Sequence, residues 1–156
     1  MTKQPSPENS FLADHVAHLV DSHLRLTGRP LINLKASPEN VAEAVFNAEF
    51  VVLSSGTEAD PLFNYANRCA LELFEFGWDD LITLPARESA EAVNQNERAK
   101  LMQQVIDSGC IENYAGVRVS ASGRRFMIEQ ATVWNVHSND GALLGQAAAF
   151  SLWHDV

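Results

Sequence analysis

Hydrophobic residues recur along the chain with two periods, one typical of strands and one typical of helices. The clearest strand pattern covers residues 114–135, where two runs rich in Val, Ile, Thr, Phe and Trp flank Ser122 and Gly123. Because glycine reaches a positive φ without steric cost, this segment predicts a β-hairpin. A second turn signal, Asn-Asp-Gly at 139–141, precedes another apolar run at 143–153. The sequence therefore predicts three consecutive antiparallel strands in a meander.

The beginning of the chain has the spacing of helices. From about residue 10 to 27, apolar residues between Leu12 and Leu24 recur along one helical face, which predicts an amphipathic helix. Ser37 before Pro38 predicts the start of a second, short helix, because serine accepts hydrogen bonds from the first turn and proline fits the first helical position.

Two strands and a block of helices are predicted between these regions. Residues 50–53 form a short apolar run and residues 62–66 an aromatic one, and both have the length of strands. Asn67 is placed to cap a following helix, and Asn94 with Glu97 resembles a capping box for another. This order predicts an α+β fold with a five-stranded antiparallel sheet, N-terminal helices, and further helices between the second and third strands.

The second strand of the hairpin has apolar residues in both strand registers, so both faces of the sheet should be covered. We expect Phe126, Ile128 and Trp134 on one face and Met127, Ala131 and Val133 on the other. The first helix is predicted to cover the face turned away from the other helices, because it has a matching apolar stripe. Polar residues in such a strand need partners, since burying an unpaired polar group costs roughly 1–3 kcal/mol.

Composition and charge narrow the class of protein. With 156 residues, 46% of them apolar, the chain is long enough for one domain, which we expect over 10–156 after a disordered lead-in at 1–9. Eleven basic residues against 20 acidic ones oppose direct binding to nucleic acid. The only local basic group, Arg118, Arg124 and Arg125, fits a solvated strand end as well as an anion site. No segment has the pattern of a membrane span or signal peptide, so we expect a soluble, cytoplasmic protein.

Three segments resemble a known family. They are D-P-L-F-N-Y-A-N-R-C-A-L-E-L-F at 60–74, L-P-A-R-E-S-A-E at 84–91 and G-V-R-V-S-A-S-G-R-R-F-M-I-E-Q-A-T-V-W-N at 116–135. In these residues the chain resembles a PAS domain and, more closely, the MEKHLA domain, a PAS-related family found in bacterial proteins and at the end of some plant homeodomain-zipper transcription factors. With the preceding helices, the resemblance covers nearly the whole chain. It implies a PAS-like pocket between the sheet and its helices, a role in sensing or dimerisation, and no established catalytic activity.

The resemblance leaves the cofactor unknown. Flavin-binding PAS photoreceptors place a reactive Cys on the helix that corresponds here to residues 85–94, and this stretch has no Cys. Haem-binding PAS sensors often take an axial His from the long helix before the meander, and no His occurs between Thr27 and Asn135. These two cofactor types are disfavoured, whereas a non-covalent flavin or a differently ligated haem stays open.

The leading hypothesis is a small stand-alone sensory or regulatory module that binds a small organic ligand and signals through a partner protein or as a homodimer. Aromatic walls with a few polar groups are typical of sites for such ligands. The expected ligand-binding residues are Phe63, Tyr65, Phe74, Arg118, Gln130, Thr132 and Trp134. The competing interpretation is that the aromatic residues are core and that the polar ones pair with backbone or lie at the sheet margin.

Two other function classes compete with the sensory module. An interaction or dimerisation module without a ligand would pair through the sheet and the apolar stripe of the first helix. A small lyase or isomerase would use Asp14 with His18, or Glu129 with a pKa raised by an apolar strand. The chain has no nucleophile elbow, zinc-protease motif or phosphate-binding loop, so we expect no catalytic residues and no metal site.

Overall fold

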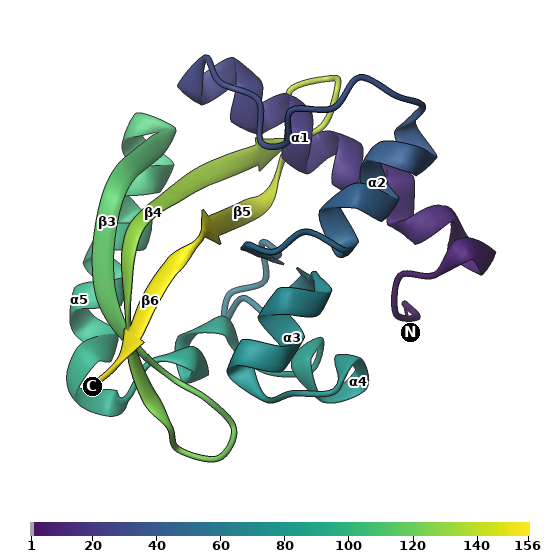
Figure 1. The fold of residues 1–156 in the computed structure, drawn as a ribbon. Coiled ribbons are helices and arrows are strands. Elements are labelled where there is room, and N and C mark those ends of the chain that lie inside the picture. Colours follow the sequence, from purple (N-terminus) through teal and green to yellow (C-terminus); the bar gives the residue numbers. More distant parts are fainter. Residues whose placement is uncertain (1) are drawn as a thin grey trace.

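The fold combines an antiparallel sheet with helices on both of its faces (Figure 1). The computed structural model describes residues 2–156. The helices are η1 (Pro7–Leu12), α1 (Ala13–Thr27), α2 (Pro38–Phe46), α3 (Arg68–Phe74), α4 (Trp78–Leu81), η2 (Ala86–Ser89) and α5 (Ala92–Ser108). The strands are β1 (Val51–Ser55), β2 (Phe63–Ala66), β3 (Cys110–Val119), β4 (Arg125–His137), β5 (Leu143–Phe150) and β6 (Leu152–Asp155). No helix within this range is long and apolar enough to cross a membrane.

The strands of the described chain form a six-stranded sheet in the order β2-β1-β5-β4-β3, with β6 paired to the first part of β4. All pairings are antiparallel, which confirms the predicted α+β class and the meander of β3, β4 and β5. The last predicted strand is divided at Ser151, where the chain bends between β5 and β6. Gly145 lets β5 approach β1 closely, since a Cβ on it would lie 2.9 Å from the carbonyl carbon of Ser55.

A β-bulge at Gln130 changes which residues of β4 share a face. Gln130 has a left-handed φ of 52°, and it and the residue before it stand opposite Ala115 of β3. The extra residue reverses the alternation of side chains, so Ile128 and Ala131 share one face and Trp134 lies on the other. The predicted assignment of faces is therefore wrong. The face toward α3 and α5 carries Phe126, Ile128, Ala131 and Val133.

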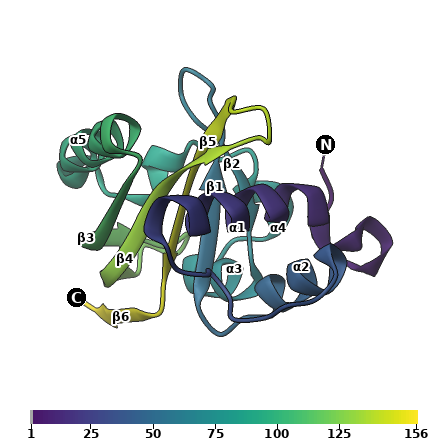
Figure 2. The same ribbon diagram turned by 90° about the horizontal axis from the view of Figure 1, so that it is seen from above.

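Helix α1 crosses the opposite face and packs on the later part of β4 (Figure 2). Trp134 is fully buried beneath it and donates its indole N–H to the carbonyl of Leu19 at 3.2 Å. The His23 ring meets the indole edge-on, with ring centroids 4.8 Å apart. The hydroxyl of Ser22 accepts from the N–H of His137 at 3.0 Å. The predicted cover by the first helix is confirmed, and α2 packs beside α1 on the same side.

Helices α3 and α5 cover the other face of the sheet. Phe74 of α3 meets Phe126 edge-on, with ring centroids 5.1 Å apart. Leu101 and Val105 of α5 are buried against Val133. Burial of this apolar surface is a main stabilising contribution to the fold.

Asn67 confirms the predicted helix cap and also joins three elements. Its side-chain oxygen accepts from the N–H of Ala70 in α3 and from the N–H of Val52 in β1, both at 3.1 Å. Its side-chain nitrogen donates to the carbonyls of Val45 in α2 at 3.0 Å and of Phe50 at 2.7 Å. The amide is fully buried, and these contacts use all of its hydrogen-bonding groups.

Two predicted helix starts differ from the structure. Residues 10–12 have left-handed φ values, which a right-handed helix cannot contain, so α1 begins only after them. The indole of Trp78 donates to the carbonyl of Thr2 at 2.8 Å, and the disordered lead-in at 1–9 stays a prediction. Helix α5 begins before Asn94, which therefore does not cap it.

Candidate functional site

A small cavity lies between the sheet and the helices α3 and α5, and its volume is about 50 Å³. A water needs about 10–15 Å³, so the cavity has room for about three to five waters or one small molecule. Pockets for drug-sized ligands measure roughly 300–1,000 Å³, so a flavin or haem ring system does not fit this space as it stands. The apolar wall includes Phe63, Phe74, Ile128, Val133 and Phe150, and the polar lining includes Ser89, Arg98, Tyr114, Arg118 and Gln146.

Tyr114 and Arg118 of β3 build one polar wall of the cavity, with Gly116 between them. Tyr114, Gly116 and Arg118 alternate onto one face of the strand. Gly116 leaves room for the tyrosine ring, because a Cβ there would lie 2.8 Å from the Cζ of Tyr114 and 3.1 Å from Nη1 of Arg118. Arg118 donates from Nη2 to the Tyr114 hydroxyl at 3.1 Å and from Nη1 to the carbonyl of Val117 at 2.9 Å. The guanidinium is held beside the ring, with Cζ 5.4 Å from the ring centroid.

Arg98 of α5 brings a second guanidinium to the same cavity. Burial, with a smaller effect of the positive charge of Arg118, lowers the pKa of Arg98 from 12.5 to about 10. Within residues 2–156, the Arg98 guanidinium has no ion pair with a carboxylate. The cavity therefore has two guanidiniums of like charge in its lining, the buried Arg118 and the half-buried Arg98.

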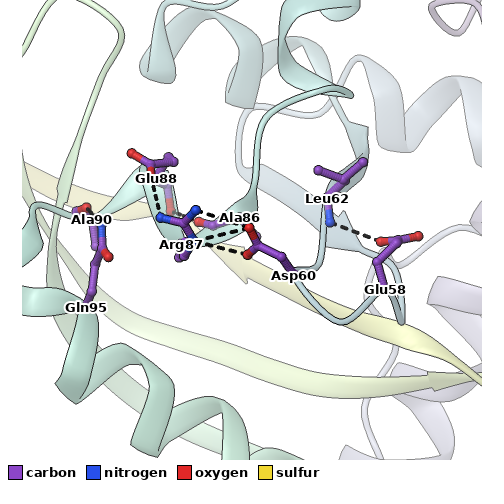
Figure 3. Close-up of polar contacts among 9 residues, drawn as sticks. Glu58, Asp60, Leu62, Ala86, Arg87, Glu88, Ala90 and Gln95 are labelled. Atoms are coloured by element: carbon purple, nitrogen blue, oxygen red, sulfur yellow. Dashed lines mark hydrogen bonds and ion pairs between the residues drawn. The ribbon is translucent and has the colours of Figure 1, made fainter.

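The loop between β1 and β2 is joined to η2 by ion pairs and hydrogen bonds (Figure 3). Arg87 of η2 donates from Nε to Asp60 at 3.1 Å and pairs with Glu88 at 2.5 Å. Glu58 accepts a hydrogen bond from the backbone of the same loop. These groups are exposed, so each pair contributes only about 0–1 kcal/mol. They are relevant to the cavity because they hold η2, and Ser89 at the end of η2 lines the cavity.

The structure brings together only some of the predicted ligand-binding residues. Phe63, Phe74 and Arg118 line the cavity. Tyr65 and Trp134 lie on the α1 side of the sheet and are fully buried in its core. The Tyr65 ring packs against Trp78 and His15, with ring centroids 6.2 Å and 5.8 Å apart, and burial raises the pKa of its hydroxyl. For these two aromatic residues, the competing interpretation as core describes their position.

Gln130 and Thr132 also lie away from the cavity. Gln130 is exposed at the bulge, and Thr132 is half-buried and follows it on β4. The bulge is the physical reason, because it displaces this part of β4 from regular alternation. Sequence reasoning missed Arg98, although a signal was present: Arg98 precedes Leu101 and Met102 at helical spacing and so shares the apolar face of α5.

The residues proposed for the other function classes lie apart from the cavity. Glu129 is exposed and lies 3.7 Å from His154, so it lacks the apolar surroundings that the enzyme hypothesis requires. Asp14 is exposed on α1. Val16 and Leu19 are buried against the chain's own sheet, which removes from solvent much of the stripe assigned to a partner. Among the residues described, no group of three or more His, Cys, Asp or Glu could hold a metal ion.

The three arginines of the basic group, Arg118, Arg124 and Arg125, do not share one environment in the structure. Arg124 pairs with Asp155 at 2.7 Å, and Arg125 pairs with Glu91 at 2.5 Å, and both arginines are exposed. Arg118 is turned inward and only 7% exposed. Of the three, only Arg118 contributes to the cavity.

Comparisons with known proteins agree with this architecture. The family model of the MEKHLA domain matches residues 13–155. The Homeobox-leucine zipper protein REVOLUTA of Arabidopsis thaliana is 29% identical over 158 residues that cover 95% of this chain. The Homeobox-leucine zipper protein HOX32 of Oryza sativa subsp. japonica is 27% identical over 158 residues that cover 97% of it. The chain spans 18% of the length of each of these plant proteins.

Two solved structures share the fold. The PAS domain of a protein from Colwellia psychrerythraea has a TM-score of 0.61 at 11% identity, over 76% of this chain and 95% of that chain. An RNA-binding light-oxygen-voltage receptor has a TM-score of 0.64 at 16% identity, over 82% of this chain and 36% of that chain. At such identities the likeness shows the fold alone, which is that of PAS domains. With the family match over nearly its full length, the chain belongs to the MEKHLA domain family.

Proposed function

We propose that this MEKHLA domain is a sensory or regulatory module that binds a small organic ligand in the cavity beside α5 and signals through a partner or through self-association. The observation that carries the proposal is Arg98, whose guanidinium lies at the cavity without a carboxylate partner within residues 2–156. An enclosed charge without a partner costs free energy in a purely structural core. A ligand that contacts it would offset that cost.

The position and composition of the cavity support the same function. Its apolar wall and few polar groups have the character of a small-molecule site. It lies between the sheet and its helices, where the resemblance to PAS domains implied a pocket. The neighbouring light-oxygen-voltage structure is, by its name, a receptor, which favours a sensory role here.

A thermal-shift screen of the purified domain against small organic compounds tests the proposal. A ligand at about 100 times its dissociation constant adds roughly 2.7 kcal/mol to the free energy of unfolding. For a chain of this size, that raises the melting temperature by about 5–10 °C. If no compound in a broad screen stabilises the protein, the cavity is a packing defect and the proposal fails.

A cavity-filling variant locates the binding. Ala148 lines the cavity, so Ala148→Leu should fill it and abolish the stabilisation by every confirmed ligand. Ala115→Leu is the matched control, because Ala115 is exposed on β3. Wild-type affinity in Ala148→Leu would place the ligand elsewhere and contradict the proposed site.

The signalling half of the proposal has its own measurement. Light scattering coupled to size-exclusion chromatography, with and without a confirmed ligand, reports the mass of the assembly. We expect the ligand to shift a monomer–dimer equilibrium or to change binding to a partner. A mass that stays constant would leave only the partner route for the output.

A further inference from the structure

The cavity lining is positively charged, although the protein as a whole has a formal net charge of -9. Arg98 from α5 and Arg118 from β3 contribute to it, and no described lining residue is Asp or Glu. In an acidic protein, a space that combines two arginines with no acid has the opposite sign to its surroundings. A negatively charged ligand would complement it.

The other six arginines of the described chain are all exposed; four of them pair with a carboxylate, whereas Arg25 and Arg68 do not. The arginines that pair with carboxylates are Arg29, Arg87, Arg124 and Arg125. All four are exposed, where water already stabilises the charge. Within residues 2–156, the buried Arg118 and the half-buried Arg98 have no carboxylate partner, although charges withdrawn from water have the greater need of one.

The hydrogen-bond donors of the two arginines remain available to a ligand. A guanidinium has five N–H donors, and Arg118 uses two of them on Tyr114 and the Val117 carbonyl. Arg98 makes no hydrogen bond within the described chain. A planar group with two acceptor oxygens matches such donors, because guanidinium and carboxylate pair through parallel N–H···O bonds.

The size and walls of the cavity set the rest of the ligand. About 50 Å³ accommodates a molecule of about four to six non-hydrogen atoms, by comparison with the space that waters need. The remaining wall is apolar, with Phe63, Ile128 and Val133 among its members. We propose, building on the function above, that the ligand is a short-chain organic carboxylate whose carboxylate lies between Arg98 and Arg118.

Isothermal titration calorimetry with butyrate, butyramide and nitrate tests this inference in a buffer free of other small anions. Butyrate and butyramide have nearly the same shape, so their difference reports the charge. We expect butyrate to bind at least about tenfold more tightly than butyramide, as for a charge-assisted pair. Nitrate has the charge and planar oxygens without the apolar part, so it should bind at least about tenfold more weakly than butyrate.

Variants assign the effect to the two arginines. Arg98→Gln should weaken butyrate binding at least about tenfold and leave butyramide unchanged. Arg98→Lys keeps the charge without the planar fork and should restore part of the affinity, which also covers the case in which Arg98→Gln folds poorly. Arg124→Gln is the matched control, because Arg124 is exposed and paired with Asp155.

Each contrary result has a distinct meaning. Equal binding of butyrate and butyramide, lost in Ala148→Leu, would overturn the carboxylate and leave the small-ligand function standing. Binding of nitrate as tight as that of butyrate would overturn the organic ligand in favour of an inorganic anion. If butyrate fails to bind while other compounds stabilise the protein in the screen, the inference fails alone; if nothing binds, the proposed function fails with it.

Discussion

Lowering the pH from about 7.5 to about 5 should destabilise the fold through His15. This residue of α1 is half-buried against the sheet, and its Nε2 lies 2.9 Å from the hydroxyl oxygen of Ser54. The Ser54 hydroxyl donates its hydrogen to Asn64 at 2.5 Å, so its oxygen accepts at His15. Neutral His15 therefore carries its proton on Nε2. Burial, with a smaller effect of the charge on His18, lowers the pKa of His15 from 6.5 to about 4.

The size of the effect follows from proton linkage. Below about pH 6.5 the unfolded chain binds a proton at His15, whereas the folded chain resists protonation until about pH 4. The contribution of neutral His15 to the free energy of unfolding is therefore fully present above pH 6.5 and decreases as the pH falls toward 4. One pH unit within this window corresponds to about 1.4 kcal/mol, so the decrease between pH 7.5 and pH 5 is about 2 kcal/mol.

Urea denaturation at the two pH values measures this loss directly. His15→Leu cannot titrate, so its free energy of unfolding should change by about 2 kcal/mol less than that of the wild type over the same interval. Burial also lowers the pKa of His23, but that contribution is common to both proteins and cancels. His137→Gln is the control, because it removes a half-buried histidine at the end of β4. If wild type and His15→Leu lose the same stability between the two pH values, the reasoning about His15 is refuted.

Three further substitutions test the packing. Trp134→Ala should lower the free energy of unfolding by about 3–5 kcal/mol in urea melts, because it removes a fully buried indole and leaves a cavity under α1; a loss below about 1 kcal/mol would show that the indole is not core. Gly145→Ala should cost about 2–3 kcal/mol, because its Cβ would meet the backbone of Ser55 and cannot be avoided by a side-chain rotation; wild-type stability would contradict the close approach of β1 and β5. Gly116→Ala should cost only about 1 kcal/mol, because the atoms that its Cβ meets are the ends of the Tyr114 and Arg118 side chains. It should also displace Arg118 and so weaken butyrate binding measured by calorimetry. An unchanged affinity would argue against this wall of the cavity.

The sequence predicted the elements that depend on local chemistry. The caps at Ser37 and Asn67 are confirmed, because each side chain accepts a hydrogen bond from the first turn of the helix that follows it. The turn at Gly123 is also confirmed, with a positive φ of 86°. Local signals do not show the other contacts of Asn67, which depend on segments up to 22 residues away.

The candidate site was predicted less completely, because its residues depend on how the strand faces turn. Gln130 adopts a positive φ without being a glycine, so no turn residue marks the bulge. Its trace in the sequence is the pair of polar residues between Ile128 and Ala131, which interrupts the alternation. Regular alternation along β4 would put Trp134 on the same face as Phe126 and Ile128, which is why the sequence predicts it in the pocket. The bulge puts it on the α1 side instead. Arg98 escapes prediction because a charged residue is expected to point to solvent, whereas here it shares the apolar face of α5 with Leu101 and Met102.

The hairpin of β3 and β4 has a second bulge, in β3, where Glu112 and Asn113 both stand opposite Thr132, and this bulge affects how the protein avoids aggregation. In the described sheet β3 is an edge strand of 10 residues, long enough to serve as a template for strands of other molecules. Asn113 interrupts that edge with a left-handed φ of 59°, and the exposed Glu112 beside it adds a charge. A second chain could not extend a regular hydrogen-bonded ladder along this edge without burying the carboxylate of Glu112, which pairs with Arg29. The irregularity of the hairpin therefore opposes edge-to-edge association, and a β3 made regular at Asn113 should associate more readily at high concentration.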